Sequence, residues 1–199
     1  VVCCAPTNMH KEVLIKCANA GKHIFTEKVL TLTYEDAIEV KEAVDKAGVM
    51  FTICLFQRCH GNKIEAKRIA DSGELGKITH ARVRNVHTGK SANWLPEHFY
   101  DKTACGGGAM VDLGAHPMYL LQWILGDEKK VSSLFTNALE QRVEDNAVSV
   151  IEFEEGKIGI AETAFVSAYT PTIVEISGAE GRVVTSAFTN LYKATAKTD

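Results

Sequence analysis

The chain has 199 residues, of which 46% are hydrophobic and 24% are charged, and its formal net charge is -3. This length and apolar content suffice for one large domain or two small ones. The charge balance, without any run of basic residues, does not favour a nucleic-acid surface. No apolar segment is long enough to span a bilayer, so no membrane contact is expected.

The cysteines and the two ends of the chain give expectations about its setting. The cysteines have no regular spacing and form no CxxC pair, and no secretion signal precedes them. We therefore expect free thiols in a reducing, cytoplasmic environment. The sequence opens directly on "VVCCA", which is typical of a buried strand, and closes on "LYKATAKTD" without a clear final element. We therefore expect the chain to be a piece of a longer protein.

The first half of the chain alternates apolar runs with amphipathic segments. Three apolar runs predict buried strands, at residues 1–5, 22–28 and 49–56. Three segments with helical periodicity follow them and end at glycine, at residues 6–21, 33–48 and 61–76. Thr33 is expected to cap the second of these helices. Such alternation indicates βαβ units and a parallel sheet, which is part of a doubly wound nucleotide-binding fold.

The pattern changes near Gly73 to Gly76. The strands expected beyond this point alternate apolar and polar residues and are joined by hairpin turns, at residues 77–89, 131–139, 146–166, 172–188 and 190–197. One helix is expected at residues 108–125. The sequence therefore predicts an incomplete Rossmann-type α/β domain at residues 1–75. An α+β domain with an open, mostly antiparallel sheet, itself truncated, follows at residues 76–199.

Asp112 and His116 are two strongly polar side chains within an apolar helical segment. At a spacing of four residues they are expected to share one helix face. A histidine can accept a proton from an alcohol near neutral pH, and a carboxylate one turn away can orient its ring. Two other readings stay open at this point. One is an ordinary solvated helix face, and the other is a metal site, for which no third ligand is evident.

Polar side chains also follow each predicted parallel strand. Ligands of open α/β sheets bind beyond the carboxyl ends of the strands, so these groups are expected to meet at one edge of the sheet. A lysine there can polarise a carbonyl or hydroxyl oxygen; a surface loop or a helix cap is the simpler alternative. The candidates are Pro6, Thr7 and Asn8 after the first strand, Glu27 and Lys28 after the second, and Gln57 and Arg58 after the third.

Three other features are given structural interpretations. The glycines at residues 106–108 lack the GxGxxG spacing of a phosphate loop and are expected to form a tight helix entry. Cys54, Cys59 and His60 are not expected to bind a metal. Trp123 is expected in the core, whereas Trp94, in a loop that contains proline, is a candidate for substrate contact.

Together, "APTNMH", "AGKHIFTEK", "SGELGKI" and "GGGAMVDLGAHPMYLLQWILG" resemble the glucose–fructose oxidoreductase / inositol dehydrogenase / MocA (Gfo/Idh/MocA) family, in order and over nearly the whole chain. The resemblance implies an N-terminal Rossmann domain that binds NAD or NADP. It also implies a second domain with an open sheet that forms a dimer or tetramer. The implied reaction is oxidation of a sugar or polyol hydroxyl, or reduction of the matching carbonyl.

Carried over by position, the resemblance gives each candidate a role. Lys28 polarises the reacting oxygen, His116 takes the hydroxyl proton, and Asp112 orients His116; these three residues also contact the substrate, as Trp94 is expected to do. The resemblance also places five residues at the nicotinamide end of the cofactor: Pro6, Asn8, His10, Glu27 and Arg58. Thr7, Gln57 and Lys28 are expected to contact the cofactor as well.

The chain departs from the family pattern at three places. Val29 replaces the proline of the Glu-Lys-Pro motif, which leaves Lys28 less firmly aimed. Tyr119 stands where many members have aspartate, three residues after the histidine. The family's glycine-rich loop would lie upstream of Val1, so this chain by itself is expected to bind cofactor weakly or not at all. A non-catalytic sensor or binding protein of the same fold is therefore an alternative, and a metal-dependent hydrolase or lyase is a third.

Overall fold

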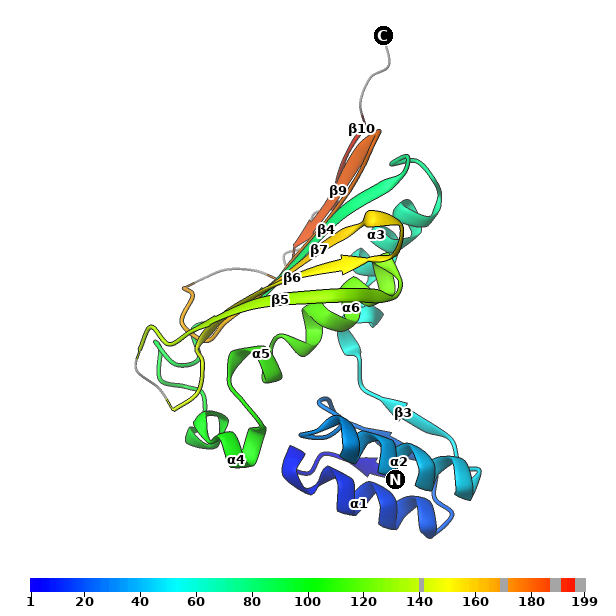
Figure 1. Ribbon diagram of the computed structural model, residues 1–199, viewed down its shortest axis with the longest axis vertical. Coiled ribbons are helices and arrows are strands. Elements are labelled where there is room, and N and C mark those ends of the chain that lie inside the picture. The colour runs from blue at the N-terminus through cyan, green and yellow to red at the C-terminus, as the bar shows by residue number, and fades with distance from the viewer. Residues whose placement is uncertain (140–141, 169–171, 187–190, 196–199) are drawn as a thin grey trace.

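The computed structural model describes residues 1–139, 142–168, 172–186 and 191–195, and it arranges them in two packed units (Figure 1). The first unit contains a parallel three-stranded sheet in the order β1-β2-β3, and helices α1 and α2 pack against each other beside it. Its core consists of Cys3, Leu14, Ala18, Ile24 and Val40. The bounds are β1 Val2–Cys3, α1 Thr7–Asn19, β2 Ile24–Thr26, α2 Tyr34–Ala47 and β3 Phe51–Ile53. These elements confirm the alternation predicted for this half.

Helix α2 shows how local sequence sets the ends of an element. The Thr33 side chain accepts a hydrogen bond from the Asp36 backbone N–H, at 3.2 Å, and so caps the first turn. At the other end Gly48 adopts a φ of 62°, in the left-handed region that glycine enters without a steric penalty.

Replacing Thr33 by Ala should lower the free energy of unfolding by about 1 kcal/mol, because the Asp36 N–H loses its acceptor. Thermal unfolding of Thr33→Ala beside Thr33→Ser checks this expectation. Serine keeps the hydroxyl, so equal losses in the two variants would show that the cap contributes nothing.

Among the described residues, the second unit contains a seven-stranded sheet in the order β10-β9-β8-β4-β7-β6-β5. Strands β4 and β7 run parallel, and every other neighbouring pair is antiparallel. The open, mostly antiparallel sheet predicted for this half is thus confirmed. The bounds are β4 Ile78–Val86, β5 Glu128–Thr136, β6 Asn146–Phe153, β7 Ile158–Ala164, β8 Ile173–Gly178, β9 Gly181–Ser186 and β10 Leu191–Thr195.

Short helices connect the units and lead into the second sheet. Helices α3 and α6 lie on one face of that sheet, whereas α4 and α5 lie between its end and the first unit (Figure 1). The bounds are η1 Phe56–Cys59, α3 Gly61–Asp71, η2 Glu97–Tyr100, α4 Lys102–Cys105, α5 Ala109–Asp112, α6 Ala115–Leu125 and η3 Glu154–Gly156. In the part of the chain that the structure describes, no helix has the length and apolar character needed to cross a membrane.

The largest core joins α3 and α6 to the second sheet. Ala66 and Ile69 of α3 pack in one cluster with Leu120 and Leu121 of α6 and with strand residues such as Val83. The packing removes the apolar face of α3 from water and so stabilises this helix against the second sheet. The expected division at residues 75/76 therefore cuts through this core, and the packing groups α3 with the second unit.

Candidate active site

A cavity of about 620 Å³ lies where the carboxyl ends of the parallel strands meet the second unit. Residues following β1 and β2 line one side of it, and residues of η2, α4 and α5 line the other. Six of the candidates from the sequence are among the lining residues: Pro6, Thr7, Asn8, Glu27, Lys28 and Asp112. Lys28 and Asp112, which are 84 positions apart in the sequence, thus lie together at one site.

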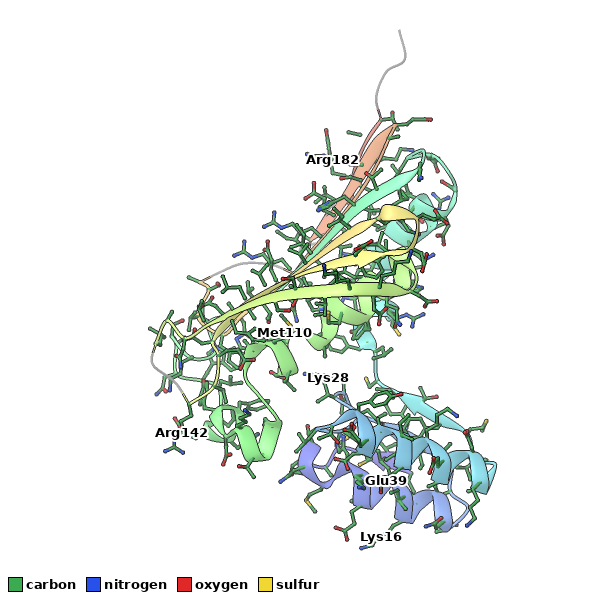
Figure 2. The ribbon with its side chains drawn as sticks, viewed as in Figure 1. Lys16, Lys28, Glu39, Met110, Arg142 and Arg182 are labelled. Atoms are coloured by element: carbon green, nitrogen blue, oxygen red, sulfur yellow. The ribbon has the colours of Figure 1, made fainter. Side chains whose placement is uncertain are left out.

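Lys28 connects the two units. It lies on the side of the first unit that faces α5 (Figure 2), and its ammonium group donates to the Asp112 backbone carbonyl at 2.8 Å and to the Asp112 carboxylate Oδ1. Both side chains are largely buried, at 17% and 19% exposure. An ammonium group held by a carboxylate and a backbone carbonyl is fixed in place, which suits it to polarise an oxygen atom.

His10 holds the backbone that carries Lys28. Its ring Nδ1 lies 2.9 Å from the Val29 carbonyl oxygen and 3.1 Å from that of Leu30, and Nε2 lies 2.8 Å from that of Ala5. The ring is 1% exposed and does not line the cavity. His10 was expected near the nicotinamide, but its ring contacts three backbone carbonyls instead of facing the cavity. It ties the end of β1 to the residues after Lys28, the segment in which Val29 replaces proline.

The single helix predicted for residues 108–125 is wrong. Helix α5 ends at Asp112 and α6 begins at Ala115, so Asp112 and His116 do not share a continuous helix face. Pro117 lacks a backbone N–H and fits the first turn of a new helix rather than a helix interior. Asp112 consequently reaches Lys28, while the Nδ1 of His116 lies 2.8 Å from the Tyr119 hydroxyl.

His116 is a neutral base at physiological pH. Burial lowers the pKa of its imidazole from the usual 6.5 to about 4, and the positive charge of Lys28 acts in the same direction. The Asp112 carboxylate opposes this shift, and Lys63 adds to it. The ring is 4% exposed and packs edge-on against Phe56, with their centroids 5.1 Å apart. His116 does not itself line the cavity, although the charges of Lys28 and Asp112 act on it. A neutral imidazole can take up a proton without first losing one to water.

The buried His116 should make the protein less stable in acid. Unfolded His116 binds a proton near pH 6.5, but folded His116 does so only near pH 4. The free energy of unfolding should therefore fall as the pH falls through this window, by about 3 kcal/mol from this group. Chemical denaturation at about pH 7 and about pH 4 measures the loss. His116→Gln should lose that much less stability than the wild type, and equal losses would contradict the assignment.

Gln57, Arg58 and Trp94 do not line the cavity. The Gln57 side chain is 7% exposed, and its Oε1 accepts from the Lys63 ammonium. The Arg58 guanidinium lies over the Trp123 ring, 5.0 Å from its centroid. Trp94 is 55% exposed and packs against His87, with ring centroids 4.7 Å apart. The first two residues fix η1 against its neighbours instead of lining the expected cofactor pocket.

Sequence reasoning missed the partners of the candidate groups. The Glu144 carboxylate accepts from the backbone N–H groups of Gly108 and Met110, both at 3.0 Å, and so fixes the start of α5. His87 lies close enough to Asp112 and Lys28 for both charges to act on its pKa, which burial lowers. Tyr119 bonds His116. The tyrosine at position 119, where many family members have aspartate, was a signal in the sequence that this residue has a special role. The contacts of Glu144 depend on tertiary structure and have no such signal.

Comparison with known proteins gives consistent matches over both units. Residues 1–54 match the oxidoreductase family described as having an NAD-binding Rossmann fold, and residues 64–184 match the GFO/IDH/MocA C-terminal domain. The scyllo-inositol 2-dehydrogenase (NAD(+)) of Bacillus subtilis (strain 168) is 31% identical over 190 residues, which is 92% of this chain and 54% of that protein. The 1,5-anhydro-D-fructose reductase of Ensifer adhaerens is 28% identical over 88% of this chain and 53% of its own length.

A solved NAD-binding oxidoreductase from Klebsiella pneumoniae superposes with a TM-score of 0.92 at 26% identity, and the match covers 100% of this chain and 57% of that one. The chain thus spans about half the length of the relatives it matches. The second-unit match alone covers more than half of the chain. The chain therefore belongs to the Gfo/Idh/MocA family of oxidoreductases.

Proposed function

We propose that the protein transfers a hydride between a nicotinamide cofactor, NAD or NADP, and a CH–OH carbon of a sugar, polyol or related substrate, or reduces the matching carbonyl. The observation that carries this proposal is the contact of Lys28 with Asp112 across the cavity between the two units. Relatives named as an inositol dehydrogenase and an anhydrofructose reductase support the substrate class and both directions of reaction.

The residues at the sheet edge fit the nicotinamide end of such a cofactor. The cavity lies at the carboxyl ends of β1 and β2, the place where doubly wound sheets bind nucleotides. Helix α1 begins there with Pro6 as its N-cap and has no side chain capping its first turn, so backbone N–H groups near Thr7 and Asn8 remain available to a ligand. Pro6, Thr7, Asn8 and Glu27 would hold the cofactor beside Lys28.

The chain's own groups supply the positioning and the proton chemistry. When bound, the cofactor accepts or donates the hydride. The Lys28 ammonium group, oriented by Asp112, donates a hydrogen bond to the reacting oxygen and stabilises the negative charge that develops on it. Neutral His116 accepts the hydroxyl proton during oxidation. Asp112 acts mainly through Lys28, since it is Lys28 that it binds directly.

The proposal includes self-association through the open face of the second sheet. On that face β5, β6 and β7 expose a patch of apolar side chains, and contiguous patches of this kind mark interaction surfaces. The patch consists of Leu134, Val148, Val150 and Ile158, each at least 40% exposed. A second copy of this chain is the proposed occupant, giving a cytoplasmic dimer or tetramer without nucleic-acid or membrane partners.

The test is turnover of a panel of inositols and sugars with NAD or NADP, followed by the absorbance of the reduced nicotinamide. The chain is assayed as it stands and together with any residues that its gene encodes upstream of Val1. Reduction of cofactor by at least one polyol is expected from the longer protein. Binding of a sugar without turnover, and without affinity for either dinucleotide, would instead support the non-catalytic sensor.

A further inference from the structure

Tyr119 lies one turn beyond His116 on α6 and forms a hydrogen bond with its ring. The Tyr119 hydroxyl oxygen is 2.8 Å from His116 Nδ1, and the two rings meet edge to face with centroids 5.5 Å apart. The same oxygen accepts a hydrogen bond from the Gln57 backbone N–H, at 3.2 Å. A chain of hydrogen bonds thus runs from η1 in the interdomain connection, through Tyr119, to the imidazole.

The direction of this chain follows from what each group can donate. A backbone N–H can only donate, so the Tyr119 oxygen is the acceptor toward Gln57. The hydroxyl retains one proton of its own, and the hydrogen bonds of the described residues give that proton one acceptor, Nδ1 of His116. Burial raises the pKa of the Tyr119 phenol, so the proton stays on this oxygen.

We propose that Tyr119 is a positioning residue that holds His116 in the tautomer with its proton on Nε2. Because the ring is neutral and accepts at Nδ1, its hydrogen must be on the other nitrogen. The sequence predicted that Asp112 orients His116, but Asp112 binds Lys28, and Tyr119 is the side chain bonded to the imidazole.

The surroundings keep this arrangement in place. Lys63 is 4% exposed and donates to the Gln57 side chain, which anchors the residue whose N–H reaches Tyr119. Phe56 packs on the His116 ring from the same short helix. The charged groups that act on the ring are Lys28, Asp112 and Lys63, and Arg58 acts on Tyr119.

The tautomer has a consequence for the substrate, which adds to the proposed function and rests on it. If the substrate oxygen of the proposed function reaches Nε2, His116 meets it as a donor, as the Lys28 ammonium does. Two donors match a carbonyl oxygen, which has two lone pairs and no proton of its own. The resting site is therefore set to bind the carbonyl form of the substrate. Oxidation requires the other tautomer, in which the ring proton is on Nδ1 and Nε2 is free to accept the hydroxyl proton.

The test is two-bond 1H–15N NMR of the chain labelled with 15N-histidine, at neutral pH. His116→Gln identifies the His116 signals among those of the seven histidines. We expect an unprotonated Nδ1 and a protonated Nε2 in the wild type. Tyr119→Phe should convert His116 to a mixture of tautomers, while the other histidines keep their signals. A proton on Nδ1 in the wild type, or an unchanged tautomer in Tyr119→Phe, would overturn the proposal.

Tyr100→Phe is the matched control. Tyr100 is buried, and its hydroxyl has no hydrogen-bond partner among the described residues, so this variant should leave His116 unchanged. The measurement needs neither cofactor nor turnover. A protein that shows the expected tautomer but never reduces a nicotinamide would refute the proposed function and leave the role of Tyr119 intact.

Discussion

Replacing Lys28 by Ala should slow hydride transfer about 100- to 1,000-fold, the effect of removing one preorganised donor from a developing oxyanion. The ammonium group contacts Asp112 at two points in the cavity, and among the described residues no other lysine lines that cavity. The loss should fall on kcat, because the donor acts most strongly on the charge of the transition state. Steady-state kinetics with the best polyol of the panel measures it.

Lys22→Ala is the control for this substitution. Lys22 is exposed on the same unit, so its removal changes the net charge equally and should leave turnover unchanged. Dinucleotide binding by Lys28→Ala, followed by NADH fluorescence, shows whether the cofactor site survives. Wild-type kcat in Lys28→Ala would contradict the role assigned to this lysine.

Replacing Gly108 by Ala should destabilise the second unit by about 3 kcal/mol, at the upper end of ordinary overpacking. A Cβ at this position would lie 2.0 Å from the Glu144 backbone carbonyl oxygen, a contact that a side-chain movement cannot relieve. Glu144 also bonds the Gly108 and Met110 N–H groups, so relief requires α5 to move away from this partner. The melting temperature should fall by about 6–12 °C.

Gly61→Ala is the matched substitution, because nothing lies within 4 Å of a Cβ built there and its φ is not positive. Differential scanning calorimetry of the two variants separates close packing from the general effect of adding a methyl group. If both variants melt within about 1 °C of each other, the approach of α5 to Glu144 is not as tight as described.

Much of the fold follows from local sequence. Buried parallel strands are short apolar runs, and the helices between them end at residues such as Gly48 whose φ is positive. Those signals are local, so the chain order of the first unit could be predicted. The position of β4 between β8 and β7 could not, because strand pairing depends on contacts between distant segments. The same reason applies to α3, whose apolar face does not specify which sheet it covers.

The sequence identified several residues of the candidate site, but it did not predict which partners they contact. Lys28 and Asp112 were identified, but the helix break at Leu113 and Gly114 changes which partner Asp112 reaches. Pro117 was the local signal of that break. Gln57 was assigned to the cofactor because it lies near a strand end, and His10 because the family resemblance implied it. Their actual partners are three backbone carbonyls and Lys63, and no spacing rule predicts such contacts.

The most direct test of the central claim is transfer of carbon-bound deuterium to the cofactor. A polyol from the panel, deuterated at its CH–OH carbons, is incubated with NAD or NADP and the protein, and the nicotinamide is analysed by mass spectrometry. We expect one deuterium in the reduced nicotinamide with the wild type and about 100-fold less product with Lys28→Ala. Reduced cofactor without deuterium, or equal labelling by the two proteins, would contradict hydride transfer at the Lys28–Asp112 site.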